Sequence, residues 1–133
     1  MWFTYMRKWV RWRLAFRIMF YALVCLGMFL GMRPTPPPVA FSGMAVLYHA
    51  GGLCACTLLS YLGHPRWHWW VRFVLMFAVG LAVEMVQSFH PTRSADVYDL
   101  YANSVGVAIG LAIIWAWRMW SRKRFHPRAV SKA

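Results

Sequence analysis

The chain has 133 residues, of which 61% are hydrophobic and only 14% are charged, and its formal net charge is +12 at pH 7. Soluble domains carry about 25% charged residues, so this composition excludes an ordinary soluble domain and indicates an integral membrane protein. The basic residues flank apolar stretches and do not form one face of a soluble module, which argues against a nucleic-acid partner.

Residues 1–13 combine basic and aromatic side chains. This mixture suits the headgroup region of a bilayer, so we expect a short basic, aromatic interfacial segment before the first span. The apolar run that follows predicts a membrane span near 14–32. A signal peptide is the alternative for this region, but the run is long and the proline-rich stretch 34–38 is typical of a stiff linker, not of a cleavage site.

Three further apolar stretches approach the roughly 20 residues that a spanning helix needs. They predict spans near 44–62, 69–88 and 99–118, joined by short connections. The expected fold class is therefore all-α: an integral membrane bundle of four transmembrane helices in one domain, 14–118, followed by a basic tail, 119–133.

The distribution of lysine and arginine predicts how the bundle is oriented. If both termini are cytoplasmic, thirteen of the 15 basic residues lie on the cytoplasmic side and only Arg33 and Arg93 lie outside. Lysine and arginine resist translocation, so we expect both termini in the cytoplasm. The basic residues would then contact anionic lipid headgroups at the cytoplasmic face.

All three acidic residues, Glu84, Asp96 and Asp99, fall within one window between positions 84 and 99. The expected topology places this window on the extracytoplasmic side. Glu84 lies below the outer boundary of the hydrocarbon core, where an ionisable group is costly and usually faces a partner or a wet cavity. Asp96 is expected to cap the helix that begins beside it.

Helical spacing places polar side chains from three spans at one level near the outer surface, next to the loop that joins the last two spans. The loop contributes Arg93, the cation nearest in sequence to the carboxylates. We predict that these residues form one ligand-binding site: His49, Glu84, Gln87, Arg93, Asp99 and Asn103.

Glycines lie deeper on the same helical faces, at Gly80, Gly106 and Gly110. Small residues at this spacing let a neighbouring helix backbone approach closely, so we predict a packing role for them. The three cysteines lie inside spans without metal-type spacing. The sequence therefore predicts no metal site and no cofactor.

The compound pattern Glu84-x-x-Gln87, Pro91-x-Arg93 and Asp96-x-x-Asp99-x-x-x-Asn103-x-x-Gly106-x-x-x-Gly110 resembles the VanZ-like family of small bacterial membrane proteins. The resemblance covers the four-span core from about Gly43 to Gly110, and His49 also fits it. Where many relatives carry an acidic residue shortly before this histidine, the chain has Ser42-Gly43-Met44.

The resemblance implies a multi-pass protein of the bacterial cytoplasmic (inner) membrane, with a site at the outer face. The family takes its name from an accessory gene of glycopeptide-resistance clusters that is associated with reduced teicoplanin susceptibility. Lipid-linked cell-wall precursors and lipid-tailed antibiotics are both encountered at that face, so the resemblance implies a role in the cell envelope or in antibiotic resistance.

Three hypotheses for the function remain open at this point. The favoured one is non-enzymatic binding of a lipid headgroup, a lipid-linked cell-envelope intermediate or an amphiphilic lipoglycopeptide, with Arg93 holding a phosphate or carboxylate. The second is an intramembrane enzyme acting on lipid phosphate or glycan linkages, with Glu84, His49 and Asp99 as candidate catalytic residues. In that hypothesis Glu84 is a general acid or base, and Asp99 pairs with His49 or holds a divalent cation. The third is a purely structural protein whose polar cluster ties helices together and whose glycine faces could meet a second copy in a homo-oligomer.

Overall fold

The computed structural model describes residues 2–36, 38–93 and 96–125, with the backbone alone for residues 2–8 and 125. Four helices and no strand occur in these ranges: α1 (Trp2–Met32), α2 (Met44–Gly63), α3 (Trp69–Ser88) and α4 (Val97–Phe125). Each helix contains a stretch long and apolar enough to cross a membrane. The expected all-α, multi-pass architecture with four membrane helices is confirmed at this level.

Helices α2 and α3 occupy the expected ranges to within one residue, whereas α1 and α4 extend further. Residues 2–13 do not form a separate element, because α1 runs unbroken from Trp2 into the apolar stretch. No glycine or proline interrupts this segment before Gly27, so nothing in it breaks a helix. Helix α4 continues into the basic tail, where Arg122, Lys123 and Arg124 lie in its last turn and favour the helix dipole. The remainder of the predicted tail, 126–133, lies outside the described residues.

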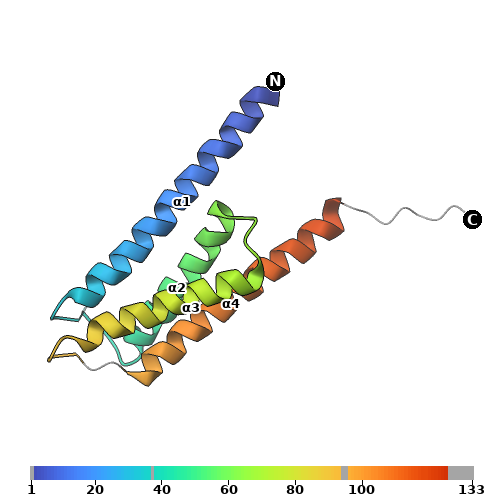
Figure 1. Cartoon of the computed structure of the whole chain (residues 1–133). Helices are drawn as coiled ribbons and strands as arrows, with labels where there is room; N and C mark the ends of the chain where they lie inside the picture. Colours follow the sequence, from blue (N-terminus) through green and yellow to red (C-terminus); the bar gives the residue numbers. More distant parts are fainter. Residues whose placement is uncertain (1, 37, 94–95, 126–133) are drawn as a thin grey trace, which may run out of the picture.

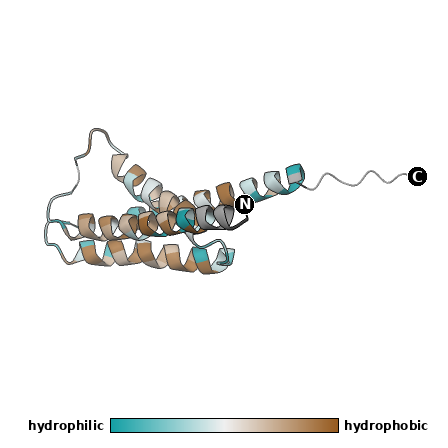
Figure 2. Ribbon diagram, turned by 90° about the horizontal axis from the view of Figure 1, so that it is seen from above, coloured by the Kyte–Doolittle hydropathy of each residue, from teal (hydrophilic) through white to brown (hydrophobic). Residues whose placement is uncertain are grey.

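The helices run alternately up and down, so the two ends of the bundle differ (Figure 1). We call the end with the connections 33–43 and 89–96 the acidic end, because the three carboxylates lie towards it. The opposite end, with the connection 64–68 and both described ends of the chain, is the basic end. Figure 2 shows hydrophobic residues along the helices and hydrophilic ones at the far end of α4.

Helices α2 and α4 pack most closely, and two glycines of α4 make this approach possible. A Cβ atom at Gly106 would overlap the backbone of Ala50, and one at Gly110 would lie 2.7 Å from Cβ of Thr57. Thr57 is fully buried at this contact and donates its hydroxyl to the Leu53 carbonyl at 2.7 Å. Helix α1 packs on α2 and α3 at the side of this close pair.

A buried arginine holds the basic end together. Arg72 is 2% exposed and donates to the Ser60 hydroxyl (3.0 Å), the His64 carbonyl (2.8 Å) and the Trp67 carbonyl (3.4 Å). These bonds fasten α3 to the end of α2 and to the connection between them. Burial lowers the pKa of His64, and the charges of Arg17 and Arg72 lower it further. Its ring stacks on Trp67, with the ring centroids 4.2 Å apart.

Candidate functional site

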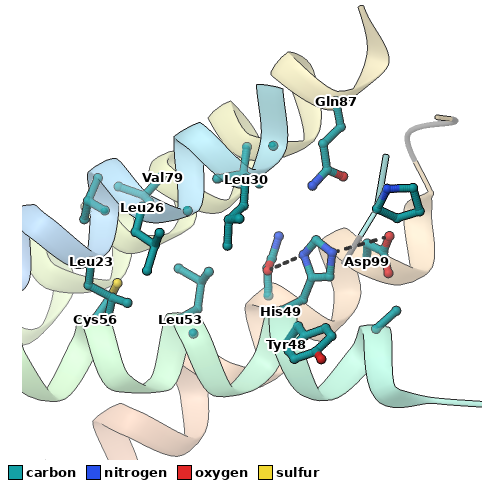
Figure 3. A pocket seen from close by; sticks show the side chains of 18 of the residues that line it. Leu23, Leu26, Leu30, Tyr48, His49, Leu53, Cys56, Val79, Gln87 and Asp99 are labelled. Atoms are coloured by element: carbon teal, nitrogen blue, oxygen red, sulfur yellow. Dashed lines mark hydrogen bonds and ion pairs between the residues drawn. The ribbon is translucent and has the colours of Figure 1, made fainter. Parts of the chain in front are cut away.

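Three helices bring the predicted polar residues together at the acidic end. His49 of α2 lies between the two carboxylates: its Nδ1 is 3.3 Å from Oε1 of Glu84 on α3, and its Nε2 is 3.6 Å from Oδ2 of Asp99 on α4. The same Nδ1 is 3.2 Å from Oδ1 of Asn103, also on α4 (Figure 3). We call His49, Glu84, Asp99 and Asn103 the polar cluster.

Asn103 is the buried centre of this cluster, with 1% of its surface exposed. Its Nδ2 donates to Oε1 of Glu84 (3.3 Å) and to the carbonyl of Gly80 (3.5 Å). Gly80 makes this approach possible, since a Cβ atom there would lie 3.1 Å from Cβ of Asn103. Asn103 therefore links α4, to which it belongs, directly to α3 and through His49 to α2.

The hydrogen-bond partners fix the role of Nδ1 of His49. A backbone carbonyl only accepts, so the amide nitrogen of Asn103 faces Gly80 and its oxygen faces His49. Nδ1 of His49 must then donate to that oxygen, and Glu84 lies beside it as a second acceptor. Nε2, the other ring nitrogen, lies 3.6 Å from Oδ2 of Asp99.

Glu84 is more deeply buried than Asp99, with 5% of its surface exposed. Its Oε1 has the partners given above, whereas its Oε2 is buried and has no hydrogen-bond partner among the residues that the structure describes. An unpartnered carboxylate oxygen at membrane depth is costly. Oε2 of Glu84 is therefore the atom of the cluster that could still bind a proton or a cation.

A cavity of about 530 Å³ lies beside the polar cluster, between α1, α2 and α3. His49, Asp99 and Asn103 line its polar end, together with Gln87, whose amide extends towards it (Figure 3). Its wall towards the middle of the bundle is apolar and is built by Leu23, Leu26, Leu30, Leu53, Cys56 and Val79.

Arg93 lines the same cavity, but its hydrogen bonds serve the backbone. Its Nη1 donates to the carbonyls of Leu30 (3.1 Å), Gly31 (3.4 Å) and Arg33 (3.3 Å) at the end of α1. The carboxylates of the cluster contact His49 instead, at least within the described part of the chain. Arg93 thus attaches the connection 89–96 to α1, a role that its position in the sequence did not indicate.

Asp96 lies outside the polar cluster. Its Oδ1 accepts a hydrogen bond from the backbone N–H of Tyr98 at 2.9 Å, which is the geometry of a helix cap at the start of α4. The sequence interpretation of Asp96 as a cap is confirmed.

Sequence reasoning missed two features of the site. The apolar wall that α1 contributes consists of leucines that read as ordinary lipid-facing residues. His49, Glu84 and Asp99 each offer a possible metal-ligand atom, and these atoms lie within 4.8 Å of one another. Their separation along the chain hides this grouping, because local metal-type spacing detects ligands from one segment and these come from three helices.

The family model described as VanZ/LLP1 matches residues 2–118. No curated protein and no solved structure matches the chain.

Proposed function

The chain belongs to the VanZ/LLP1 family, and from that premise we propose that it is a membrane protein that binds an amphiphile at the acidic end of its bundle. The amphiphile would be a lipid headgroup, a lipid-linked cell-envelope intermediate or an amphiphilic antibiotic of the teicoplanin type. One observation carries the proposal: a cavity with an apolar wall ends directly at a cluster of polar and ionisable side chains.

The apolar part of the cavity suits a hydrocarbon chain. Its volume of about 530 Å³ falls within the range of roughly 300–1,000 Å³ that is typical of small-molecule sites. The side chains of Leu26, Leu53 and Val79 come from three different helices and surround this space (Figure 3). A lipid chain is already out of water in the bilayer, so van der Waals contact with these side chains would hold it in the cavity.

The polar end suits a headgroup that donates hydrogen bonds. Asp99 keeps 22% of its side chain exposed, so its carboxylate can accept a bond from a hydroxyl or ammonium group in the cavity. The amide of Gln87 can both donate and accept at the same end. Such groups occur together on sugar-bearing and amine-bearing amphiphiles.

We propose further that the protein lies in the bacterial cytoplasmic membrane with both termini in the cytoplasm. The excess of lysine and arginine near the basic end supports this orientation, and these residues would contact anionic lipids of the inner leaflet. The polar cluster would then be reached from the outer leaflet, where envelope intermediates and antibiotics are met.

A pair of adjacent glycines on α2 tests the binding proposal. Gly52 lines the cavity and Gly51 does not, and a Cβ atom at either position has no neighbour within 4 Å. Gly52→Leu should fill the cavity and weaken saturable binding of a fluorescent phosphatidylethanolamine to the purified protein by about tenfold or more, equivalent to about 1.4 kcal/mol. Gly51→Leu should bind as the parent protein does. Equal binding by all three proteins would contradict the proposal.

The polar cluster also favours a second candidate, an intramembrane enzyme that acts on lipid phosphate or glycan linkages. The supporting observation is that His49 contacts both Glu84 and Asp99, an arrangement in which acid–base groups exchange protons readily. The binding experiment separates the two, because an enzyme would change the bound probe chemically and a binding protein would release it intact.

A further inference from the structure

We propose that His49, Glu84 and Asp99 bind a divalent transition-metal cation, of the Mn²⁺ or Zn²⁺ class, at the polar end of the cavity. The three side chains come from α2, α3 and α4, and one potential ligand atom from each lies within 4.8 Å of the others.

The spacing of the donor atoms suits a shared cation better than direct hydrogen bonds. Nε2 of His49 and Oδ2 of Asp99 are 3.6 Å apart, which is too long for a hydrogen bond between them. Two ligands that each lie about 2.1 Å from one metal ion are separated by roughly 3.0–3.5 Å. A small adjustment of either side chain would bring this pair into that range, and the three ligand atoms, which lie within 4.8 Å of one another, would have to draw together around the ion.

The orientation of His49 is that of a histidine prepared to bind a metal. A metal-binding histidine typically donates its other ring N–H to a fixed acceptor, which sets the tautomer and the direction of the free lone pair. Here Nδ1 faces Oδ1 of Asn103 at 3.2 Å, and Asn103 is itself held by the Gly80 carbonyl. The other ring nitrogen, Nε2, faces Asp99 at the polar end of the cavity.

Glu84 supplies an independent indication. Its Oε2 is buried and lacks a hydrogen-bond partner among the described residues, although the whole residue is 5% exposed. Two carboxylates so close together repel each other. The cation closest in sequence, Arg93, uses Nη1 for carbonyls of α1. A divalent cation would compensate both negative charges and supply the missing partner of Glu84.

The donor set decides the class of cation. One imidazole nitrogen with two carboxylates is a mixed nitrogen and oxygen donor set, which suits Mn²⁺, Fe²⁺ or Zn²⁺. Mg²⁺ and Ca²⁺ prefer sites in which all donors are oxygen atoms. Three protein ligands leave coordination positions open towards the cavity. An oxygen of a phosphate or sugar headgroup could fill them. This extension to the headgroup rests on the proposed function, whereas the cation site rests on its own geometry.

Titration of the purified full-length protein with MnCl₂ alone tests the cation site. The parent protein, first treated with a chelator and then freed of it, should take up one Mn²⁺ per chain. His49→Gln, Glu84→Gln and Asp99→Asn should each weaken uptake by at least about tenfold. Asp96→Asn is the matched control, because it removes the same charge at a helix cap outside the cluster, and it should bind as the parent does.

A spectroscopic measurement on the parent keeps the test valid if a variant fails to fold. Electron spin-echo modulation of bound Mn²⁺ should show a directly coordinated imidazole nitrogen. No saturable uptake by the parent, uptake without nitrogen coordination, or equal uptake by the folded variants would each overturn the proposal. These measurements contain no added lipid probe, so their failure would leave the proposed function standing, and a failed lipid-binding test would leave the cation site standing.

Discussion

Replacing Gly106 with alanine should greatly reduce the yield of folded protein. The added methyl group would overlap the backbone of Ala50, which cannot rotate away as a flexible side chain could. Overpacking in a tight core costs about 1–3 kcal/mol and occasionally more, and a backbone clash belongs at the upper end of that range. Helix α4 would have to move off α2, and Asn103, one turn away on the same face, would move with it.

Folded yield after detergent extraction, measured as the monodisperse fraction in size-exclusion chromatography, checks this prediction. Gly51→Ala is the matched control, because a Cβ atom there meets nothing within 4 Å. It should fold as well as the parent, or slightly better, since alanine favours a helix over glycine by about 1 kcal/mol. If Gly106→Ala gave parental yield and thermal stability, the close packing of α2 on α4 would be wrong.

Replacing Asn103 with leucine should also destabilise the protein severely. Leucine has a similar branched shape but is larger, and Oε1 of Glu84 would lose the amide donor at 3.3 Å while Nδ1 of His49 would lose an acceptor. A buried polar group left without its partner costs about 1–3 kcal/mol, and a charged one costs more. We therefore expect a loss of about 2–4 kcal/mol.

Thermal unfolding in detergent, compared with that of Ser104→Ala, measures this loss. The Ser104 hydroxyl bonds only within α4, to the Leu100 carbonyl at 3.0 Å, so its removal should change stability by no more than about 0.5 kcal/mol. Parental stability in Asn103→Leu would mean that the polar cluster does not hold the three helices together.

Much of the architecture could be predicted from the sequence because the membrane imposes simple rules on it. A spanning helix must satisfy its own backbone and must be apolar for about 20 residues, so hydropathy located all four helices. Helical periodicity then placed Glu84, Asp99, Asn103 and His49 near the same level, and the structure brings these four side chains within contact distance.

The rest of the site depends on contacts between helices that no local pattern encodes. The sequence suggested Arg93 as the partner of the carboxylates because it is the nearest cation along the chain. In the structure, the end of α1 lies closer, and its free carbonyls take the guanidinium. The cavity is equally hidden, because its leucines resemble lipid-facing ones until α1 is placed beside α2 and α3.

The most direct test of the amphiphile site is to find where a bound hydrocarbon chain lies. A phosphatidylethanolamine with a photoreactive diazirine midway along one acyl chain would be added in small amounts to the purified protein, and the adducts would be mapped by mass spectrometry. We expect adducts on Leu26, Leu53 and Val79 of the cavity wall, which saturate with probe concentration and are displaced by unlabelled lipid. Adducts confined to residues exposed on the outside of the bundle, such as Val74 and Ile109, would contradict the proposed site if their amount rose linearly with probe concentration.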